Sequence, residues 1–209
     1  MGKLRTKRIG VMGGTFDPIH YGHLFAAEES RNVFQLDEVV FVPTGNPPHK
    51  EEGPNLPAED RYRMTVMATA GNPTFRVSRV ETDREGLSYT LDTLRELRGE
   101  YGKNTVMYFI TGADAILEIM TWKEPEQILE ECCIIAATRP GYDLARLEKA
   151  LPFVEQKRRK TDPRVIVLEI PALAISSTDI RERVAAGRPI RYLVPEVVVQ
   201  FIAKSGFYR

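Results

Sequence analysis

Apolar residues along this chain form short runs rich in Val, Ile and Phe, separated by longer segments in which apolar positions recur with helical spacing. Short apolar runs bounded by Gly and Pro are typical of buried strands, and the mixed segments are typical of amphipathic helices. The pattern predicts strands at residues 9–12, 39–42, 75–80, 105–111, 133–138 and 165–170. It predicts helices at residues 24–31, 58–70, 89–101, 125–131, 144–157, 177–186 and 195–203, and another beginning after Gly112.

Regular alternation of strand and helix predicts an α/β fold, a doubly wound, Rossmann-like parallel sheet with helices on both faces. We expect a single domain over residues 1–209. Ser88 is expected to cap the helix that follows it, and Gly102 to end that helix. Ligands bind such sheets beyond the carboxyl ends of the strands. Loops at 13–23, 46–50, 112–114 and 139–141 all fall there, which makes them the candidate site.

The segment GGTFDPIHYGH, at residues 13–23, joins the first strand to the first helix. A glycine-rich turn lets backbone N–H groups approach a ligand, and the helix N-terminus that follows favours negative charge. His20 and His23 are three residues apart, which places both imidazoles on one face of the first helical turn. This arrangement suits a phosphate group better than a metal ion or a covalent intermediate.

Composition and charge exclude several classes of partner. The 209 residues include 29 Lys and Arg and 29 Asp and Glu, so no overall basic field favours nucleic acid. No apolar run is long enough to cross a membrane, and the basic start of the chain lacks the apolar region of a secretory signal. Cys132 and Cys133 are adjacent, which disfavours a disulfide or a metal site and is typical of buried free thiols in the cytoplasm.

Two common nucleotide-binding motifs do not fit the sequence. The spacing of Gly10, Gly13 and Gly14 differs from G-x-G-x-x-G, and the second strand ends in Pro43 and Thr44 where a ribose-binding acid would be expected. No G-x-x-x-x-G-K-[ST] occurs. The chain is therefore not an ordinary P-loop protein, and a hydride-transfer enzyme is disfavoured.

Residues 14–23, GTFDPIHYGH, resemble the H-x-G-H motif of the nucleotidyltransferase superfamily. Its members join a nucleoside triphosphate to a phosphate-bearing acceptor and release pyrophosphate. The resemblance implies that His20 and His23 hydrogen-bond the phosphates around the α-phosphorus and stabilise the charge that develops there. It also implies that the phosphates lie against the backbone of Gly13, Gly14, Thr15 and Phe16.

The segment ISSTDIR, at residues 175–181, resembles the second phosphate motif of the superfamily, I-S-S-T-x-I-R. Ser176 or Ser177 can cap the following helix, and a cap alone would account for both serines. Arg181 adds a cation suited to a bound anion. By the resemblance, Ile175 and Ser176 hold the triphosphate, Arg181 holds the leaving pyrophosphate, and the helices from about residue 176 close the phosphate site.

Two further segments extend the phosphate and nucleoside contacts. The loop NPPHK at residues 46–50 is either a rigid surface loop or a phosphate clamp formed by His49 and Lys50, because its prolines fix the backbone. Gly112 and Asp114 match a family Gly-x-Asp that holds the adenosine ribose.

The acceptor is indicated by a closer resemblance, to the bacterial nicotinate mononucleotide adenylyltransferases. In that family a Ser-Tyr-Thr and a Thr-Trp hold the nicotinate; Thr90 and Trp122 match them. Trp122 alone would be an ordinary core residue, whereas by the resemblance it stacks on the pyridine ring while Thr90 and backbone amides bind the carboxylate. Lys123 and Arg139 are expected beside the same nucleotide.

The resemblance implies adenylyl transfer from ATP to nicotinate mononucleotide, giving the deamido dinucleotide and pyrophosphate in NAD biosynthesis. Mg²⁺ would be bound through the ATP phosphates, without a metal site of the protein's own. Nicotinamide mononucleotide, phosphopantetheine, and an alcohol phosphate with CTP are alternative acceptor chemistries, and a non-catalytic dinucleotide sensor is an alternative of another class. The sequence is compatible with a monomer and with a homo-oligomer.

Overall fold

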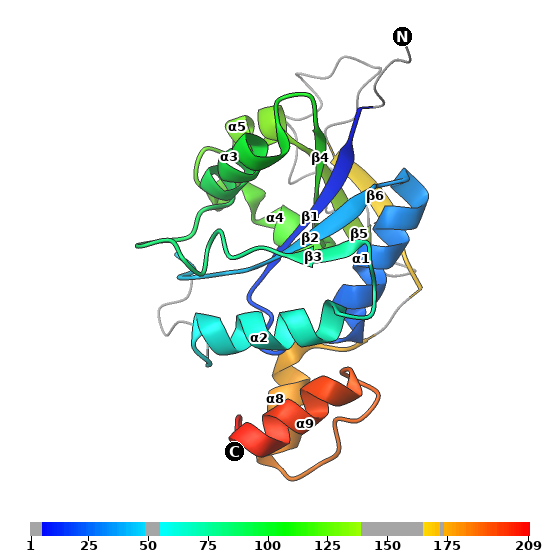
Figure 1. Cartoon of the computed structure of the whole chain (residues 1–209), viewed down its shortest axis with the longest axis vertical. Coiled ribbons are helices and arrows are strands. Elements are labelled where there is room, and N and C mark those ends of the chain that lie inside the picture. The colour runs from blue at the N-terminus through cyan, green and yellow to red at the C-terminus, as the bar shows by residue number, and fades with distance from the viewer. Residues whose placement is uncertain (1–5, 49–54, 139–164, 172–173) are drawn as a thin grey trace.

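The computed structural model describes residues 6–48, 55–138, 165–171 and 174–209. The described strands form a parallel sheet in the order β3-β2-β1-β4-β5-β6, which confirms the predicted doubly wound fold (Figure 1). The strands are β1 (Arg8–Gly14), β2 (Glu38–Pro43), β3 (Phe75–Val77), β4 (Val106–Gly112), β5 (Cys133–Thr138) and β6 (Val165–Glu169).

Helices cover both faces of this sheet. Their bounds are α1 (Tyr21–Phe34), α2 (Ala58–Thr69), α3 (Thr90–Tyr101), α4 (Ala113–Leu117), a 3-10 turn η1 (Ile119–Thr121), α5 (Pro125–Glu131), α8 (Ser177–Ala185) and α9 (Glu196–Ser205). The helix predicted at residues 144–157 lies outside the described residues. None of the described helices is long and apolar enough to cross a membrane.

Alternation along the strands divides the core into two layers. Ile9 and Val11 of β1 face a cluster that contains Leu94 of α3 and Ile128 of α5. Met12 of the same strand faces the opposite cluster, which holds apolar residues of α1, α2, α8 and α9. Because successive strand side chains point to opposite faces, one central strand supplies both cores.

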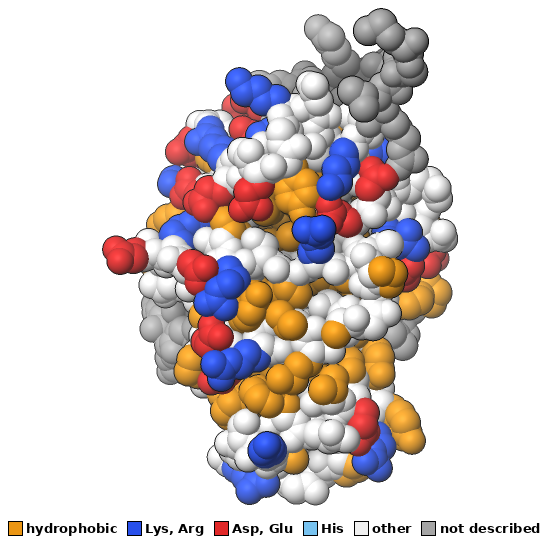
Figure 2. All heavy atoms as spheres, viewed as in Figure 1, with side chains coloured by type: hydrophobic (Ala, Val, Ile, Leu, Met, Phe, Trp, Pro, Cys, Tyr) orange, Lys and Arg blue, Asp and Glu red, His pale blue; other side chains and the backbone are white. Residues whose placement is uncertain are grey.

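The C-terminal helices lie at one end of the molecule, beyond α2 (Figure 1). Ile180 of α8 and Val198 and Ile202 of α9 are buried in the same cluster as Met64 of α2. The last helices are thereby fixed to the edge of the sheet where β1 ends. On the face seen in Figure 2, basic and acidic side chains are interspersed, in keeping with the balanced charge of the sequence.

Three local predictions are corrected by the structure. The third strand ends at Val77 rather than at residue 80, because the Ser78 hydroxyl accepts the Val80 N–H and the chain turns away from the sheet. The first helix begins at Tyr21, three residues before the predicted start. Ser88 does not cap α3: Tyr89 is the N-cap residue, and the Ser88 Oγ accepts a hydrogen bond from the Asn46 N–H instead.

The cysteines follow the prediction in part. Cys132 is buried and Cys133 is half-buried, and neither forms a disulfide. Burial raises the pKa of the Cys132 thiol to about 12.

Candidate active site

Two cavities open over the carboxyl ends of β1 and β4, where the sheet order changes direction. Ligands bind doubly wound sheets at this switch point. The imidazole cavity, of about 320 Å³, is lined by Met12, Gly13, His20, Gly22, His23, Ala26, Ile110, Thr111, Gly112, Ala137, Ile170 and Ile175. The tryptophan cavity, of about 270 Å³, is lined by residues that include Thr15, Thr44, Pro47, Glu81, Thr90, Trp122 and Lys123. Gly13 and Thr111 line both cavities, so the two spaces meet there.

His20 and His23 lie together at the N-terminus of α1, as their spacing predicts. His20 is the N-cap residue, and the two rings stack with their centroids 3.7 Å apart and their planes 22° apart. Gly22 leaves room for this pair, because a Cβ at that position would lie 3.0 Å from the His20 ring. The His20 N–H donates to His23 Nδ1 at 3.3 Å, which leaves the proton of a neutral His23 on Nε2.

Both imidazoles are neutral near pH 7 in this arrangement. Burial lowers the pKa of His20 to about 4. Burial, and secondly the neighbouring charge of His20, lowers the pKa of His23 well below its ordinary value. A polyanion placed against these rings would favour their charged form and shift both pKa values upward. The pair therefore offers N–H donors to a phosphate without carrying a permanent buried charge.

The N-terminal end of α8 is attached directly to the turn that carries the histidines. The Ser177 hydroxyl donates to the Pro18 carbonyl at 2.8 Å, and Arg181 Nη1 donates to the Asp17 carbonyl at 2.8 Å. The Ser176 Oγ caps α8 by accepting the Asp179 N–H. Of the two serines that the sequence offered as caps, Ser176 is therefore the one that caps the helix. The second predicted phosphate segment thus lies beside the first.

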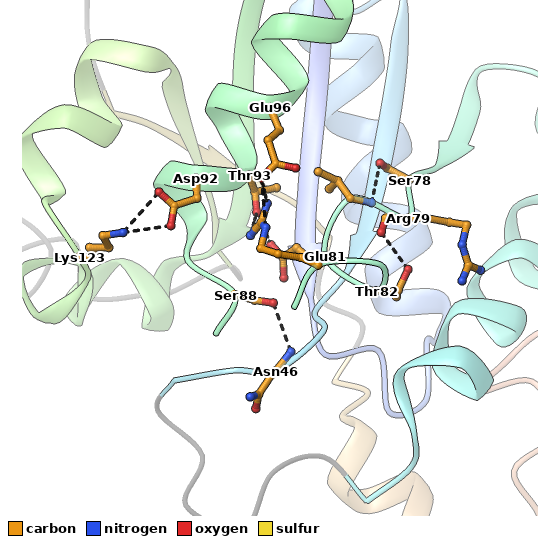
Figure 3. Close-up of polar contacts among 12 residues, drawn as sticks. Asn46, Ser78, Arg79, Glu81, Thr82, Ser88, Asp92, Thr93, Glu96 and Lys123 are labelled. Carbon is orange, nitrogen blue, oxygen red and sulfur yellow. Dashed lines mark hydrogen bonds and ion pairs between the residues drawn. The ribbon is translucent and has the colours of Figure 1, made fainter. Parts of the chain in front are cut away.

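The tryptophan cavity brings Thr90 together with the adjacent pair Trp122 and Lys123, which lies in a different segment of the chain. Trp122 is half-buried, and its ring meets the Phe109 ring edge-on with centroids 6.0 Å apart. Lys123 Nζ lies 3.0 Å from an Asp92 carboxylate oxygen (Figure 3). The same Nζ lies 4.7 Å from the centre of the Tyr89 ring. These contacts fix the segment after η1 against the start of α3.

Glu81 and Thr93 form a buried polar pair in the lining of this cavity (Figure 3). Thr93 Oγ1 donates to Glu81 Oε1 at 2.6 Å, and burial raises the pKa of the Glu81 carboxyl, opposed by the Thr93 hydrogen bond. Ser88 is tied to Asn46 twice, since its N–H donates to the Asn46 carbonyl at 2.8 Å and its Oγ accepts the Asn46 N–H. The loop at residues 44–48 is therefore attached to the segment that precedes α3.

The remaining predicted residues are placed as follows. Gly14 lines the tryptophan cavity, whereas Phe16 is buried and has a positive φ of 49°. Asp114 is exposed in the first turn of α4 and lines neither cavity. His49, Lys50 and Arg139 lie outside the described residues.

Sequence reasoning missed a cluster of buried polar residues beneath the turn at residues 13–23, which we call the histidine turn. Arg61 is fully buried, and Asp17 is almost so. Asp17 accepts hydrogen bonds from the Tyr208 hydroxyl at 2.7 Å and the Asn55 N–H at 2.7 Å. An arginine inside a polar helix segment normally faces solvent, so no local pattern distinguishes Arg61 from its neighbours.

The described residues include no cluster of three or more His, Cys, Asp or Glu that could hold a metal ion. The groups that line the cavities are instead imidazoles, hydroxyls, backbone, a tryptophan, the Lys123 ammonium and the carboxyl of Glu81. Such a set suits anions and a flat ring.

Comparison with known proteins agrees with this geometry. Residues 11–183 match the cytidylyltransferase-like family model. A "Probable nicotinate-nucleotide adenylyltransferase" of Moorella thermoacetica is 58% identical over 205 residues, covering 98% of this chain and 93% of the relative. A protein of the same description from Thermoanaerobacter sp. is 54% identical over 206 residues, covering 98% and 96%.

The fold also matches a solved structure, Plasmodium falciparum nicotinic acid mononucleotide adenylyltransferase complexed with NaAD. The TM-score is 0.77 at 23% identity, and the match covers 97% of both chains. The chain belongs to the cytidylyltransferase-like family and, within it, to the nicotinate-nucleotide adenylyltransferases.

Proposed function

We propose that this protein transfers the adenylyl group of MgATP to nicotinate mononucleotide, forming nicotinate adenine dinucleotide and pyrophosphate in NAD biosynthesis. The observation that carries the proposal is that the imidazole and tryptophan cavities meet at Gly13 and Thr111. A donor in one cavity and an acceptor in the other would touch only where the new bond forms. A cytoplasmic setting is part of the proposal.

The imidazole cavity is assigned to ATP. His20 and His23 would donate hydrogen bonds to oxygens on the α-phosphorus. The backbone of residues 13–16 would lie against the same phosphates where the two cavities meet, since Gly13 lines both cavities and Gly14 and Thr15 line the tryptophan cavity. Arg181 and Ser176 would hold the β- and γ-phosphates, with α8 and α9 closing the site. We also assign Gly112, Asp114 and Ile175 to the adenosine side, and His49 and Lys50 to the triphosphate. Mg²⁺ enters with ATP as part of the substrate.

The tryptophan cavity is assigned to nicotinate mononucleotide. Trp122 would stack on the pyridine ring, and Thr90 would donate to the carboxylate. Lys123 supplies a positive charge at the same cavity, and we place Arg139 beside the acceptor as well. These contacts favour an acid over the neutral amide of nicotinamide mononucleotide.

The reaction is a displacement at the α-phosphorus. An oxygen of the acceptor phosphate forms a bond to that phosphorus as the bond to the bridging oxygen of pyrophosphate breaks, and the bond electrons leave with pyrophosphate. The acceptor is an anion near pH 7, so no general base is needed. The protein's task is to hold two polyanions in line and to stabilise charge on the transferring group.

Pyrophosphate release tests the proposal. The purified protein is given MgATP with nicotinate mononucleotide or with nicotinamide mononucleotide, and kcat/KM is measured for each. We expect a clear preference for nicotinate mononucleotide. Equal efficiency on the two acceptors would contradict the assignment of the carboxylate pocket, and no pyrophosphate with either would contradict the transferase function.

A further inference from the structure

Arg61 on α2 is a fully buried cation whose side chain joins three separate segments near the site. Its Nη1 donates to the Thr15 carbonyl at 2.7 Å, its Nη2 to the Gly45 carbonyl at 3.2 Å, and its Nε to the Leu56 carbonyl at 3.0 Å. Thr15 belongs to the histidine turn, and Gly45 belongs to the loop at residues 44–48. One planar guanidinium therefore contacts the backbone of both the histidine turn and the 44–48 loop.

The bond to Thr15 sets the direction of a peptide group in the histidine turn. The Thr15–Phe16 peptide is trans, so its N–H points away from its carbonyl. Since the carbonyl faces Arg61, the Phe16 N–H faces the opposite way. Phe16 also has a positive φ, an unfavourable conformation for an aromatic residue that its surroundings must hold. Arg61 supplies one such restraint.

The bond to Gly45 acts on the other loop. The Gly45–Asn46 peptide is held at both ends, by Arg61 at the carbonyl and by the Ser88 Oγ at the N–H. A Cβ at Gly45 would fall inside contact distance of the Glu81 carbonyl oxygen, so this backbone already lies against its neighbour. The following Pro47 and Pro48 line the tryptophan cavity.

The charge of Arg61 is compensated locally. Burial lowers the pKa of Arg61, and the nearby Asp17, Tyr208 and Glu81 oppose that shift. A buried cation is costly unless it is hydrogen-bonded and paired. An apolar side chain would fill the same space without that cost, but it could not hold three carbonyls of three segments.

We propose that Arg61 is a positioning residue, which fixes the peptide groups of the histidine turn and of the 44–48 loop so that donor and acceptor phosphates meet in line. This inference rests on the proposed function. Arg61 contacts neither cavity and acts through the backbone that it holds. Its planar fork is essential to the role, because a lysine ammonium is a point charge that cannot reach three separated carbonyls in one plane.

Steady-state kinetics of Arg61→Lys and Arg61→Met test the proposal, with both substrates varied. We expect kcat to fall about 100-fold in both variants, since small misplacements of reacting groups cost that much. Met64→Ala is the matched control, because Met64 is buried on the same helix and packs in the apolar core. It should lower the melting temperature and leave kcat unchanged when assayed while folded.

Wild-type activity separates this inference from the proposed function, since an inactive wild type would contradict the function itself. With an active wild type, a wild-type kcat in folded Arg61→Met would overturn the positioning role. A wild-type kcat in Arg61→Lys would also overturn it, because charge alone would then suffice.

If neither variant folds, Gly45→Ala displaces the same bond from the loop side. It should raise the KM for nicotinate mononucleotide and leave that for ATP unchanged; an unchanged acceptor KM would overturn the proposal.

Discussion

Mild acid should destabilise this protein through the two buried histidines. The His20 imidazole ordinarily titrates near 6.5, and burial lowers its pKa to about 4 in the folded chain. Between pH 6.5 and 4, the His20 imidazole binds a proton in the unfolded chain but not in the folded chain. The free energy of unfolding therefore decreases as pH falls from 6.5 toward 4. Above pH 6.5 His20 is neutral in both states, and the free energy of unfolding does not suffer this loss.

The size of the effect follows from the separation of the two pKa values. At pH 5 the unfolded imidazole lies about 1.5 pH units below its pKa, while the folded imidazole is still mostly neutral. Each unit is worth about 1.4 kcal/mol, so His20 alone lowers the free energy of unfolding by about 2 kcal/mol at pH 5. His23 shifts in the same direction and adds to the loss.

Urea unfolding of the wild type and of His20→Asn, at pH 8 and at pH 5, isolates this contribution. Carboxylates and the other histidines titrate in both proteins, so the difference between the two pH dependences reports on His20 and on its coupling to His23. We expect the wild type to lose about 2 kcal/mol more than the variant between these pH values. The same loss in both proteins would refute the idea that His20 is buried in its neutral form.

Two further substitutions test neighbouring parts of the site. His23→Ala should abolish pyrophosphate release while circular dichroism shows a folded protein, because a donor to the transferring phosphate is removed; an active, folded variant would contradict the mechanism. Tyr208→Phe should lower the free energy of unfolding by about 1.5–3 kcal/mol in urea titrations, since it removes a hydrogen bond to the buried Asp17 carboxylate. A stability equal to the wild type would show that this contact contributes nothing.

The fold could be predicted because each strand and most helices are specified locally. Buried runs in β1, β2, β4 and β5 are apolar on both faces, as a strand covered on both sides must be. One of the errors arose where a side chain bonds over long range. Ser88 has the residue type of a helix cap, but its hydroxyl is used by Asn46, which is 42 positions away. No local pattern encodes that choice.

The candidate site likewise has parts that the local sequence specifies and parts that depend on contacts between distant residues. The spacing of His20 and His23 specifies their stacked geometry, because one turn of helix determines it. The turn is rich in glycine, yet the residue with positive φ there is Phe16. Arg61, 46 positions along the chain, bonds the preceding Thr15 carbonyl, and such a contact becomes visible only when the fold brings α2 beside the turn.

Gly13 has a role that its place in a glycine-rich motif does not convey. It lies in β1 with no positive φ, so it is not needed there for backbone freedom. Space around it is tight, because a Cβ at this position would lie 3.2 Å from the Phe109 ring. Gly13 lines both cavities and Phe109 lines the tryptophan cavity, so a side chain at position 13 would crowd that cavity beside the region where the two meet. Reaction between two bound nucleotides requires that region to be open, which accounts for a glycine at position 13, one residue before β1 ends.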